Sequence, residues 1–304
     1  MPSKKPPLHY LLVFIVPAFM VYTVFLSFPV IDSLRLSFMT ESQSGALSFV
    51  GLDNFHKLFT EPIWSGRFWN ALRNNFVFFL IHMLYQNVIG LSLAALLTSR
   101  GVRGTAFFRT LVFIPSLLSF VIIGFIWKLM LNPLWGMVDD PLRAIGLGAL
   151  VLPWLGDARS ALIAISLISS WQFTGLAMIL FTAALLNVPD DIRDAASVDG
   201  ANGWQVFWRI RFPLTLPTIW VVSLLTFVGN FNAFDLIYTM QGKQAAPNFA
   251  TDIMGTFFYR TAFGSEAQRP NPTMGATIAA MMFFVILLGF LIYLALQRRT
   301  RVEV

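Results

Sequence analysis

The stretch Ser160–Pro189, which reads SALIAISLISSWQFTGLAMILFTAALLNVP, contains no charged residue. A helix needs about 20 residues to cross a hydrocarbon core of about 30 Å, whereas a tilted strand needs only about 10. The stretch exceeds the helical requirement and does not alternate apolar and polar side chains as a barrel strand would. Because a helix satisfies its own backbone hydrogen bonds in lipid, the stretch predicts a membrane-spanning helix.

Five further stretches of the chain also lack charge. Hydrophobic residues make up 57% of the 304-residue chain and charged residues only 12%, with a mean hydropathy of +0.70. A soluble domain has about 25% charged residues, so this composition excludes disorder and argues against a soluble enzyme. We predict an all-α polytopic membrane protein with a single transmembrane domain over 1–304. Its six spans are expected near 10–31, 74–99, 108–131, 160–187, 214–238 and 272–297.

The charge-free stretch nearest the N-terminus, Tyr10–Ile31, has a second reading as a signal peptide, because Lys4 and Lys5 precede it. The apolar core of a signal peptide usually has about 7–15 residues and is followed by a cleavage site with small residues. Tyr10–Ile31 is longer than that, and no such site follows it. We therefore expect a retained helix.

Lys and Arg are distributed unevenly between the connecting segments. Their density in segments 1–9, 99–110, 187–214 and 298–304 is about twice that in 32–73, 132–159 and 241–272. The positive-inside rule then places both termini in the cytoplasm. The formal excess of +6 falls on that side, and the basic residues form no run with interleaved aromatics. We expect contact with lipid and none with nucleic acid.

The two long external segments, 32–73 and 241–272, are rich in aromatic residues. Such segments lie on the membrane surface as amphipathic helices or as part of an aromatic belt. The alternative is a docking platform for an external partner. The sequence leaves both readings open.

The internal loop 188–213 predicts a short helix, a glycine stop and a second short helix. Asp190 is a candidate N-cap, and Gly200 suits the left-handed conformation after a helix. Asn202 is a candidate cap for the second helix, which Pro213 is expected to end. A small helix of this kind suits insertion into a groove of a partner. By composition alone, a surface hairpin without partners fits as well.

The same loop resembles the EAA motif of ABC-importer permease subunits, in which E-A-A is followed after three residues by G and, nine residues later, by I-x-L-P. Here Asp194-Ala195-Ala196 precedes Gly200 by three residues, and Ile210-Arg211-Phe212-Pro213 follows with the same spacing. The chain departs from the pattern in having Asp194 in place of Glu and Phe212 in place of Leu. The shorter Asp194 side chain changes the reach of any ion pair at that position.

The resemblance extends over nearly the whole chain and points to the carbohydrate-uptake branch, maltose and glycerol-phosphate type, first permease subunit. The stretches that carry it are Gly51–Phe55, Phe107–Arg109 with Pro115, Phe234–Tyr238 and Gln297–Arg299.

The resemblance implies a type I ABC-importer permease fold in a bacterial or archaeal cytoplasmic membrane. It also implies a coupling helix, with Asp194, Ala195, Ala196, Asp199 and Gly200 contacting an ATPase. The implied partners are a second permease subunit, in a heterodimer, two ATPase subunits that bind ATP and Mg²⁺, and an extracytoplasmic solute-binding protein. Transport would proceed by alternating access. Oligosaccharides, monosaccharides, polyols and glycerol phosphates remain open as solutes.

Catalytic motifs are missing from the chain. It has no cysteine, no phosphate-binding G-x-x-x-x-G-K-[ST] loop, and three histidines whose spacing fits no zinc site. We therefore expect no catalytic residue, no metal and no cofactor on this chain. A membrane-embedded enzyme would need a catalytic constellation that the sequence lacks. An ion-gradient-driven secondary transporter is the main alternative, but it would show deep ionisable residues and internal repeats. The chain shows one marginal acid, Asp235, near a span end and no clear repeat.

Polar residues inside the spans are candidates for the solute pathway. Thr226 and Asn230 are four residues apart and share a helix face. Amides beside aromatic rings suit sugar recognition, although the same amides also hold helices together. The resemblance places the stretches near Gln172 and Thr226 on the cavity. The candidate pathway residues are Gln172, Phe173, Thr226, Gly229, Asn230 and Asn232. His82 is expected to make a neutral helix–helix contact.

Overall fold

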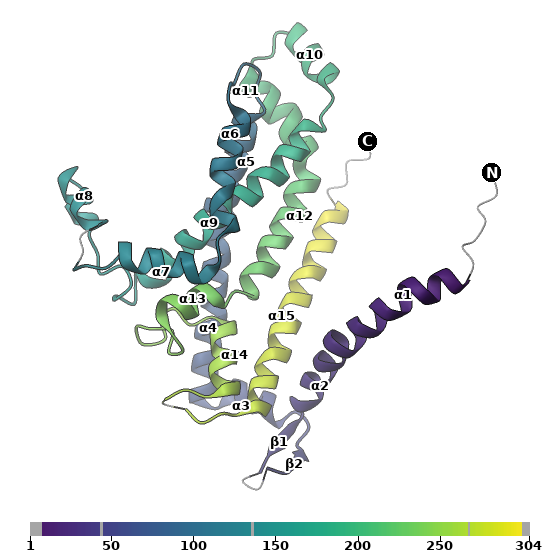
Figure 1. The fold of residues 1–304 in the computed structure, drawn as a ribbon, viewed down its shortest axis with the longest axis vertical. Helices are drawn as coiled ribbons and strands as arrows, with labels where there is room; N and C mark the ends of the chain where they lie inside the picture. The colour runs from purple at the N-terminus through teal and green to yellow at the C-terminus, as the bar shows by residue number, and fades with distance from the viewer. Residues whose placement is uncertain (1–7, 43–44, 135–136, 267, 300–304) are drawn as a thin grey trace. The chain divides into compact units, whose positions relative to one another are not determined.

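The computed structural model describes residues 8–42, 45–134, 137–266 and 268–299. These residues form helices, connecting turns and one short antiparallel hairpin (Figure 1). The chain divides into two compact units. Unit 1 comprises Met1–Ser65 and Phe258–Phe283, and unit 2 comprises Gly66–Phe257 and Phe284–Val304. The expectation of a single domain stays a prediction.

Unit 1 starts with an apolar helical stretch whose side chains from Leu12 to Leu36 are mostly exposed. It consists of α1 (Leu8–Tyr22), a π turn η1 (Thr23–Ser27) and α2 (Phe28–Leu36). Strand β1 (Met39–Glu41) then pairs with β2 (Leu47–Phe49), with Met39 opposite Phe49. The unit is completed by α3 (Asp53–Thr60), the start of α4 (Pro62–Ile81), the end of α14 (Met254–Phe263) and the first part of α15 (Pro272–Arg299).

Asn54 joins the hairpin to α3 in unit 1. Its buried side-chain amide donates hydrogen bonds to the backbone oxygens of Ser37 at 3.0 Å and Met39 at 2.7 Å. The Thr277 hydroxyl, on α15, donates to the same Ser37 oxygen at 3.3 Å. Buried carbonyls need such partners, so these bonds fix the point at which α2 leads into the hairpin. The Gly51–Phe55 segment therefore has a structural role.

Unit 2 contains the remaining helices. In chain order they are the rest of α4, the π turn η2 (His82–Asn87), α5 (Val88–Leu97), α6 (Thr105–Phe113), the 3₁₀ turn η3 (Ile114–Leu117), α7 (Phe120–Met130), α8 (Asp139–Ala144), η4 (Gly148–Leu150), α9 (Ala161–Leu186), α10 (Asp190–Val198), α11 (Gly203–Val206), the π turn η5 (Phe207–Arg211), α12 (Phe212–Phe231), α13 (Asp235–Gln241), the start of α14 and the last part of α15.

Helix α9 is the central element of unit 2. Its apolar side chains enter two buried clusters, one shared with α7 and α13 and the other with α5 and α12. Gly175 lets α9 approach the main chain of α6, because an added Cβ would lie 2.6 Å from Phe113 Cα. Close approach at small residues is how helices pack in lipid, where no hydrophobic force drives them together. Gly175 therefore sets the spacing between α9 and α6.

The third predicted span, 108–131, is not one straight helix. The segments Thr105–Leu117 and Phe120–Met130 are bent by 95° relative to each other. Leu118 is extended, and Ser119 starts a new helix by accepting a hydrogen bond from the Ile122 backbone N–H at 3.3 Å. Pro115 lies one turn earlier, where it cannot donate to a helical hydrogen bond. The stretch from Thr110 to Trp127 contains no charged residue, so the absence of charge gave no sign of this break.

The apolar helices match the predicted architecture. Among the described residues, five helices are long and apolar enough to cross a membrane, and the bent pair makes a sixth if counted as one span. The second of them is longer than predicted, because it runs from Pro62 to Leu97. The described structure is thus a mostly helical polytopic fold with one broken span.

Candidate functional site

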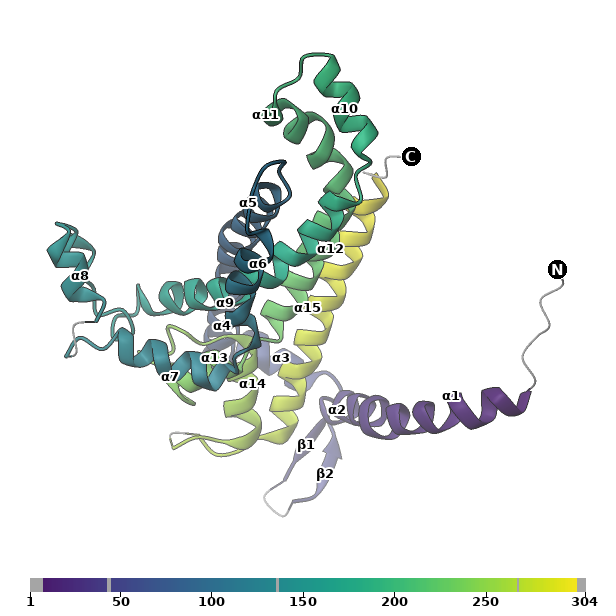
Figure 2. The same ribbon diagram turned by 45° about the horizontal axis from the view of Figure 1, so that its top comes forward.

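The internal loop forms the helix, glycine stop and second helix that the sequence predicts. Helix α10 ends in a left-handed Gly200 with φ of +82°. The Gly200 N–H donates to the Ser197 oxygen at 3.1 Å, and the Ala201 N–H donates to the Ala196 oxygen at 2.9 Å. This pair of bonds is a Schellman motif, which needs a residue at positive φ. In both Figure 1 and Figure 2, α10 and α11 lie together at one end of unit 2.

Two details of this loop differ from the prediction. The N-cap position of α10 is Pro189, and Asp190 is the first helical residue, whose carboxylate pairs with Arg193 at 2.7 Å. Pro213 does not end the second helix, which continues from α11 through η5 into α12. The π turn directly before Pro213 already shifts the hydrogen-bond register, so the missing N–H is tolerated. Asn202 does cap α11, in a reciprocal capping box with Gln205.

Helix α10 has no buried residue. Asp194, Ala195, Asp199 and Gly200 are exposed, and Ala196 is half-buried. Asp194 pairs with Arg100, in the turn between α5 and α6, at 2.8 Å. Both side chains are more than half exposed, and such surface pairs contribute at most about 1 kcal/mol. The helix is therefore attached through its ends and presents an open surface.

Two arginines, Arg211 at the base of this loop and Arg109 on α6, bind the end of α5. The buried Arg211, in η5, donates to the Thr98 hydroxyl at 2.6 Å, and Arg109 donates to the Leu97 backbone oxygen at 3.3 Å. Both contacts fall at the C-terminal end of α5, where unsatisfied carbonyls and the helix dipole favour cations. The loop is thus connected through Arg211 to the end of a membrane helix.

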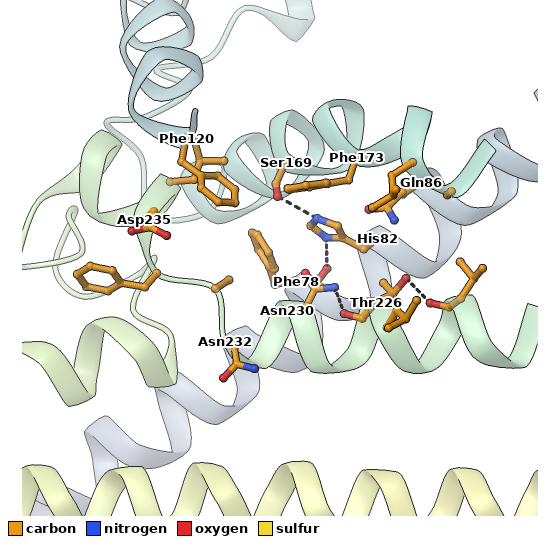
Figure 3. A pocket seen from close by; sticks show the side chains of 18 of the residues that line it. Phe78, His82, Gln86, Phe120, Ser169, Phe173, Thr226, Asn230, Asn232 and Asp235 are labelled. Carbon is orange, nitrogen blue, oxygen red and sulfur yellow. Dashed lines mark hydrogen bonds between the residues drawn. The ribbon is translucent and has the colours of Figure 1, made fainter. Parts of the chain in front are cut away.

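A second site lies inside unit 2. A cavity of about 270 Å³ is enclosed by α4, η2, α7, α9, α12 and α13, and most of its surface is apolar (Figure 3). Its polar lining comes from His82, Gln86, Ser169, Thr226, Asn230, Asn232 and Asp235. Apolar walls with a few polar groups are typical of a small-molecule site.

Five of the six predicted pathway residues line this cavity, namely Phe173, Thr226, Gly229, Asn230 and Asn232. Gln172 is not part of the lining and is 1% exposed. Its side-chain amide donates to the Leu118 oxygen at 3.0 Å, and its backbone oxygen accepts from the Ser116 hydroxyl at 2.7 Å. Gln172 therefore holds the break in the third span against α9.

His82 makes the neutral helix–helix contact that the sequence predicts, and it also lines the cavity. Its Nδ1 lies 2.8 Å from the Phe78 backbone oxygen, which can only accept, so Nδ1 carries the proton. Its Nε2 then accepts from the Ser169 hydroxyl at 3.0 Å (Figure 3). This arrangement fixes the neutral tautomer and joins η2 to α9.

Gln86 and Asp235 are lining residues that sequence reasoning did not select. Gln86 is 7% exposed, and its Oε1 has no hydrogen-bond partner among the described residues. Asp235 is an exposed residue in the first turn of α13. Within the described residues, no group of three His, Asp or Glu is placed to hold a metal ion.

The chain is similar to a large set of transport proteins. The family model described as "Binding-protein-dependent transport system inner membrane component" matches residues 86–302. The probable ABC transporter permease protein YurN of Bacillus subtilis is 34% identical over 83% of this chain and 85% of that protein. The lactose transport system permease protein LacF of Rhizobium radiobacter is 30% identical over 94% and 93%. The multiple sugar-binding transport system permease protein MsmF of Streptococcus mutans is 30% identical over 96% and 95%.

Solved structures share the fold. A bacterial ABC transporter involved in the import of the acidic polysaccharide alginate contains a chain with a TM-score of 0.81 and 23% identity, covering 96% of each chain. A chain of the inward-facing methionine transporter MetNI has a TM-score of 0.56 and 17% identity, covering 80% of this chain and 100% of that one. Nothing in these comparisons supports the alternative of an ion-gradient-driven transporter.

Proposed function

The chain belongs to the family of binding-protein-dependent transport system inner membrane components and is a permease subunit of an ABC importer, and from this premise we propose that it forms half of a pathway for a sugar or sugar-like solute. The observation that carries the proposal is the cavity of unit 2, where amide, hydroxyl and carboxylate groups lie beside Phe78, Phe120 and Phe173. Sugars present hydroxyls and apolar ring faces, which match polar groups beside aromatic rings. LacF and MsmF are named as lactose and multiple-sugar permeases, which agrees with this solute class.

The mechanism we propose is alternating access driven from α10. A partner can shift an equilibrium between two states only through contacts that differ between them. The open surface of α10, with Asp194 and Ala195 exposed, is available for such contacts. Motion of α10 would reach the cavity along α11, η5 and α12, because these form one continuous helix whose last turn contains the lining residue Asn230.

The partners in this proposal are a second permease, two ATPase subunits and an extracytoplasmic solute-binding protein. ATP and Mg²⁺ would bind to the ATPase subunits, since this chain contains no phosphate-binding loop. Its own contribution is then a pathway and a mechanical connection, without a catalytic residue. When α10 enters a groove of the ATPase, the Asp194 carboxylate would either replace its ion pair with Arg100 by a contact with the ATPase or contact both partners at once.

Solute-stimulated ATPase activity of the reconstituted complex, scanned over a sugar panel, tests the proposal. We expect Asn230→Leu to reduce solute-stimulated ATPase activity and uptake about tenfold or more, because leucine removes an amide from the lining of the cavity. Asn187→Leu is a matched control, since Asn187 is a helix C-cap residue outside the cavity. Unchanged uptake and stimulation in Asn230→Leu would limit Asn230 to helix packing.

The proposed topology places both termini and α10 in the cytoplasm. Because the chain has no native cysteine, single cysteines can report on each side of the membrane. We expect Val198→Cys, at an 88% exposed position, to react with a membrane-impermeant maleimide only from the cytoplasmic side. Glu266→Cys, also at an exposed position, should react only from outside. The reverse pattern would invert the topology.

A further inference from the structure

The cavity of unit 2 has an unusual balance of charge. Among its lining residues, Asp235 is the one carboxylate, and neither lysine nor arginine is present. His82 is 3% exposed, and burial disfavours the charged imidazolium, so it adds no positive charge. The lining therefore carries a net negative charge.

The lining includes hydrogen-bond acceptors that are available to a solute. The Asn230 side-chain NH₂ donates to the Thr226 backbone oxygen at 2.7 Å, which leaves Asn230 Oδ1 as an acceptor. Gln86 Oε1 is an acceptor without a partner among the described residues, on a side chain that is 7% exposed. A buried acceptor without a partner costs free energy, which a solute donor would recover.

Asp235 adds a stronger acceptor at one end of the cavity. Asp235 is the first residue of α13, and Figure 3 shows it at the same end of the cavity as Phe120. A carboxylate accepts charge-assisted hydrogen bonds from two neighbouring hydroxyls, and an aromatic ring beside it suits an apolar sugar face. It repels any solute that carries its own negative charge.

We propose that this cavity selects neutral, hydroxyl-rich solutes over acidic ones and that Asp235 is the residue that determines this specificity. The inference rests on the proposed function of the chain as a sugar permease. It separates this chain from the solved importer of the acidic polysaccharide alginate, whose fold it shares. It also removes uronates and glycerol phosphates from the solutes that the sequence leaves open.

The test uses the full reconstituted complex with its solute-binding protein. Stimulated ATPase activity and uptake are measured with a neutral oligosaccharide and with the uronate oligosaccharide of the same length and linkage. For the wild type we expect the neutral solute to be favoured about tenfold or more. Asp235→Asn should reduce this preference about tenfold by removing the charge, and Asp235→Lys should favour the uronate. Asp235→Glu, which restores the carboxylate, should recover most of the preference for the neutral solute.

Asp140→Asn is the matched control, because Asp140 is an exposed carboxylate outside the cavity. It should leave the preference unchanged, which separates a local effect from a change in overall charge. Stimulation of the wild type by uronates as strong as by neutral sugars, or an unchanged preference in Asp235→Asn and Asp235→Lys, overturns the inference and leaves the permease intact. Failure of every sugar to stimulate the wild-type complex overturns the proposed function itself.

Discussion

Replacing Gly200 by valine is expected to abolish ATP-driven uptake while the protein still inserts into the membrane. Gly200 has φ of +82°, a conformation that a β-branched residue strongly disfavours. No atom lies within 4 Å of the position that a Cβ would occupy. The substitution therefore acts through the backbone alone, by breaking the Schellman motif in which Ala201 N–H bonds to the Ala196 oxygen. The backbone after α10 would then run in a different direction, so α10 would be held at a different angle and would lose its contacts with an ATPase.

The control for this prediction is a residue that tolerates positive φ. Gly200→Asn should retain most of the uptake, because asparagine adopts the left-handed conformation at low cost. Gly203→Ala should be nearly neutral, since Gly203 does not have positive φ and no atom lies within 4 Å of the added Cβ. Uptake and ATPase activity are measured in proteoliposomes, with membrane insertion checked by protein yield. Wild-type uptake by Gly200→Val would show that ATP-driven transport does not depend on the backbone turn that Gly200 forms after α10.

The spans were predictable because charge is excluded from the hydrocarbon core, and the sequence shows where charge is absent. The same signal does not describe the path of the backbone. No charged residue marks the bend at Leu118 and Ser119, and the fold there depends on the bond from Gln172, which lies more than 50 residues away in sequence. A contact between distant residues leaves no local pattern, so the straight third span was a natural but incomplete expectation.

The sequence predicted which types of residue line the cavity, but it predicted less well which face of each helix they come from. Polar residues in apolar spans are candidates for function, and this rule pointed to Asn230 and Thr226. It applied equally to Gln86 and Ser169, which line the cavity, and to Gln172, which does not. Ser169 and Phe173 are four residues apart on α9 and share a face, whereas Gln172 is rotated about 100° from Phe173. The face of α9 that lines the cavity is known only once α4 and α12, which supply other lining residues, are placed in the fold.

The second prediction concerns Gly175, at which α9 packs against the main chain of α6, the first half of the broken third span. Replacing it by alanine is expected to destabilise the protein, because the new Cβ would press on the Val112 carbonyl oxygen and lie 2.6 Å from Phe113 Cα. Both atoms belong to main chain, so relief requires α6 to move away from α9. Overpacking of this kind typically costs about 1–3 kcal/mol and occasionally more. Valine at this position should be worse and should prevent accumulation of folded protein.

The measurement is the midpoint of thermal unfolding of the detergent-purified chain, and Gly66→Ala is the matched control. Gly66 lies within α4 and has no atom within 4 Å of an added Cβ. Its replacement should leave the midpoint unchanged or raise it, since alanine favours a helix over glycine by about 1 kcal/mol. Equal midpoints for the two alanine variants would mean that α6 and α9 are not in close backbone contact. A lowered midpoint for Gly175→Ala alone would show that α9 holds the broken span in place through main-chain packing, with Gln172 fixing its angle.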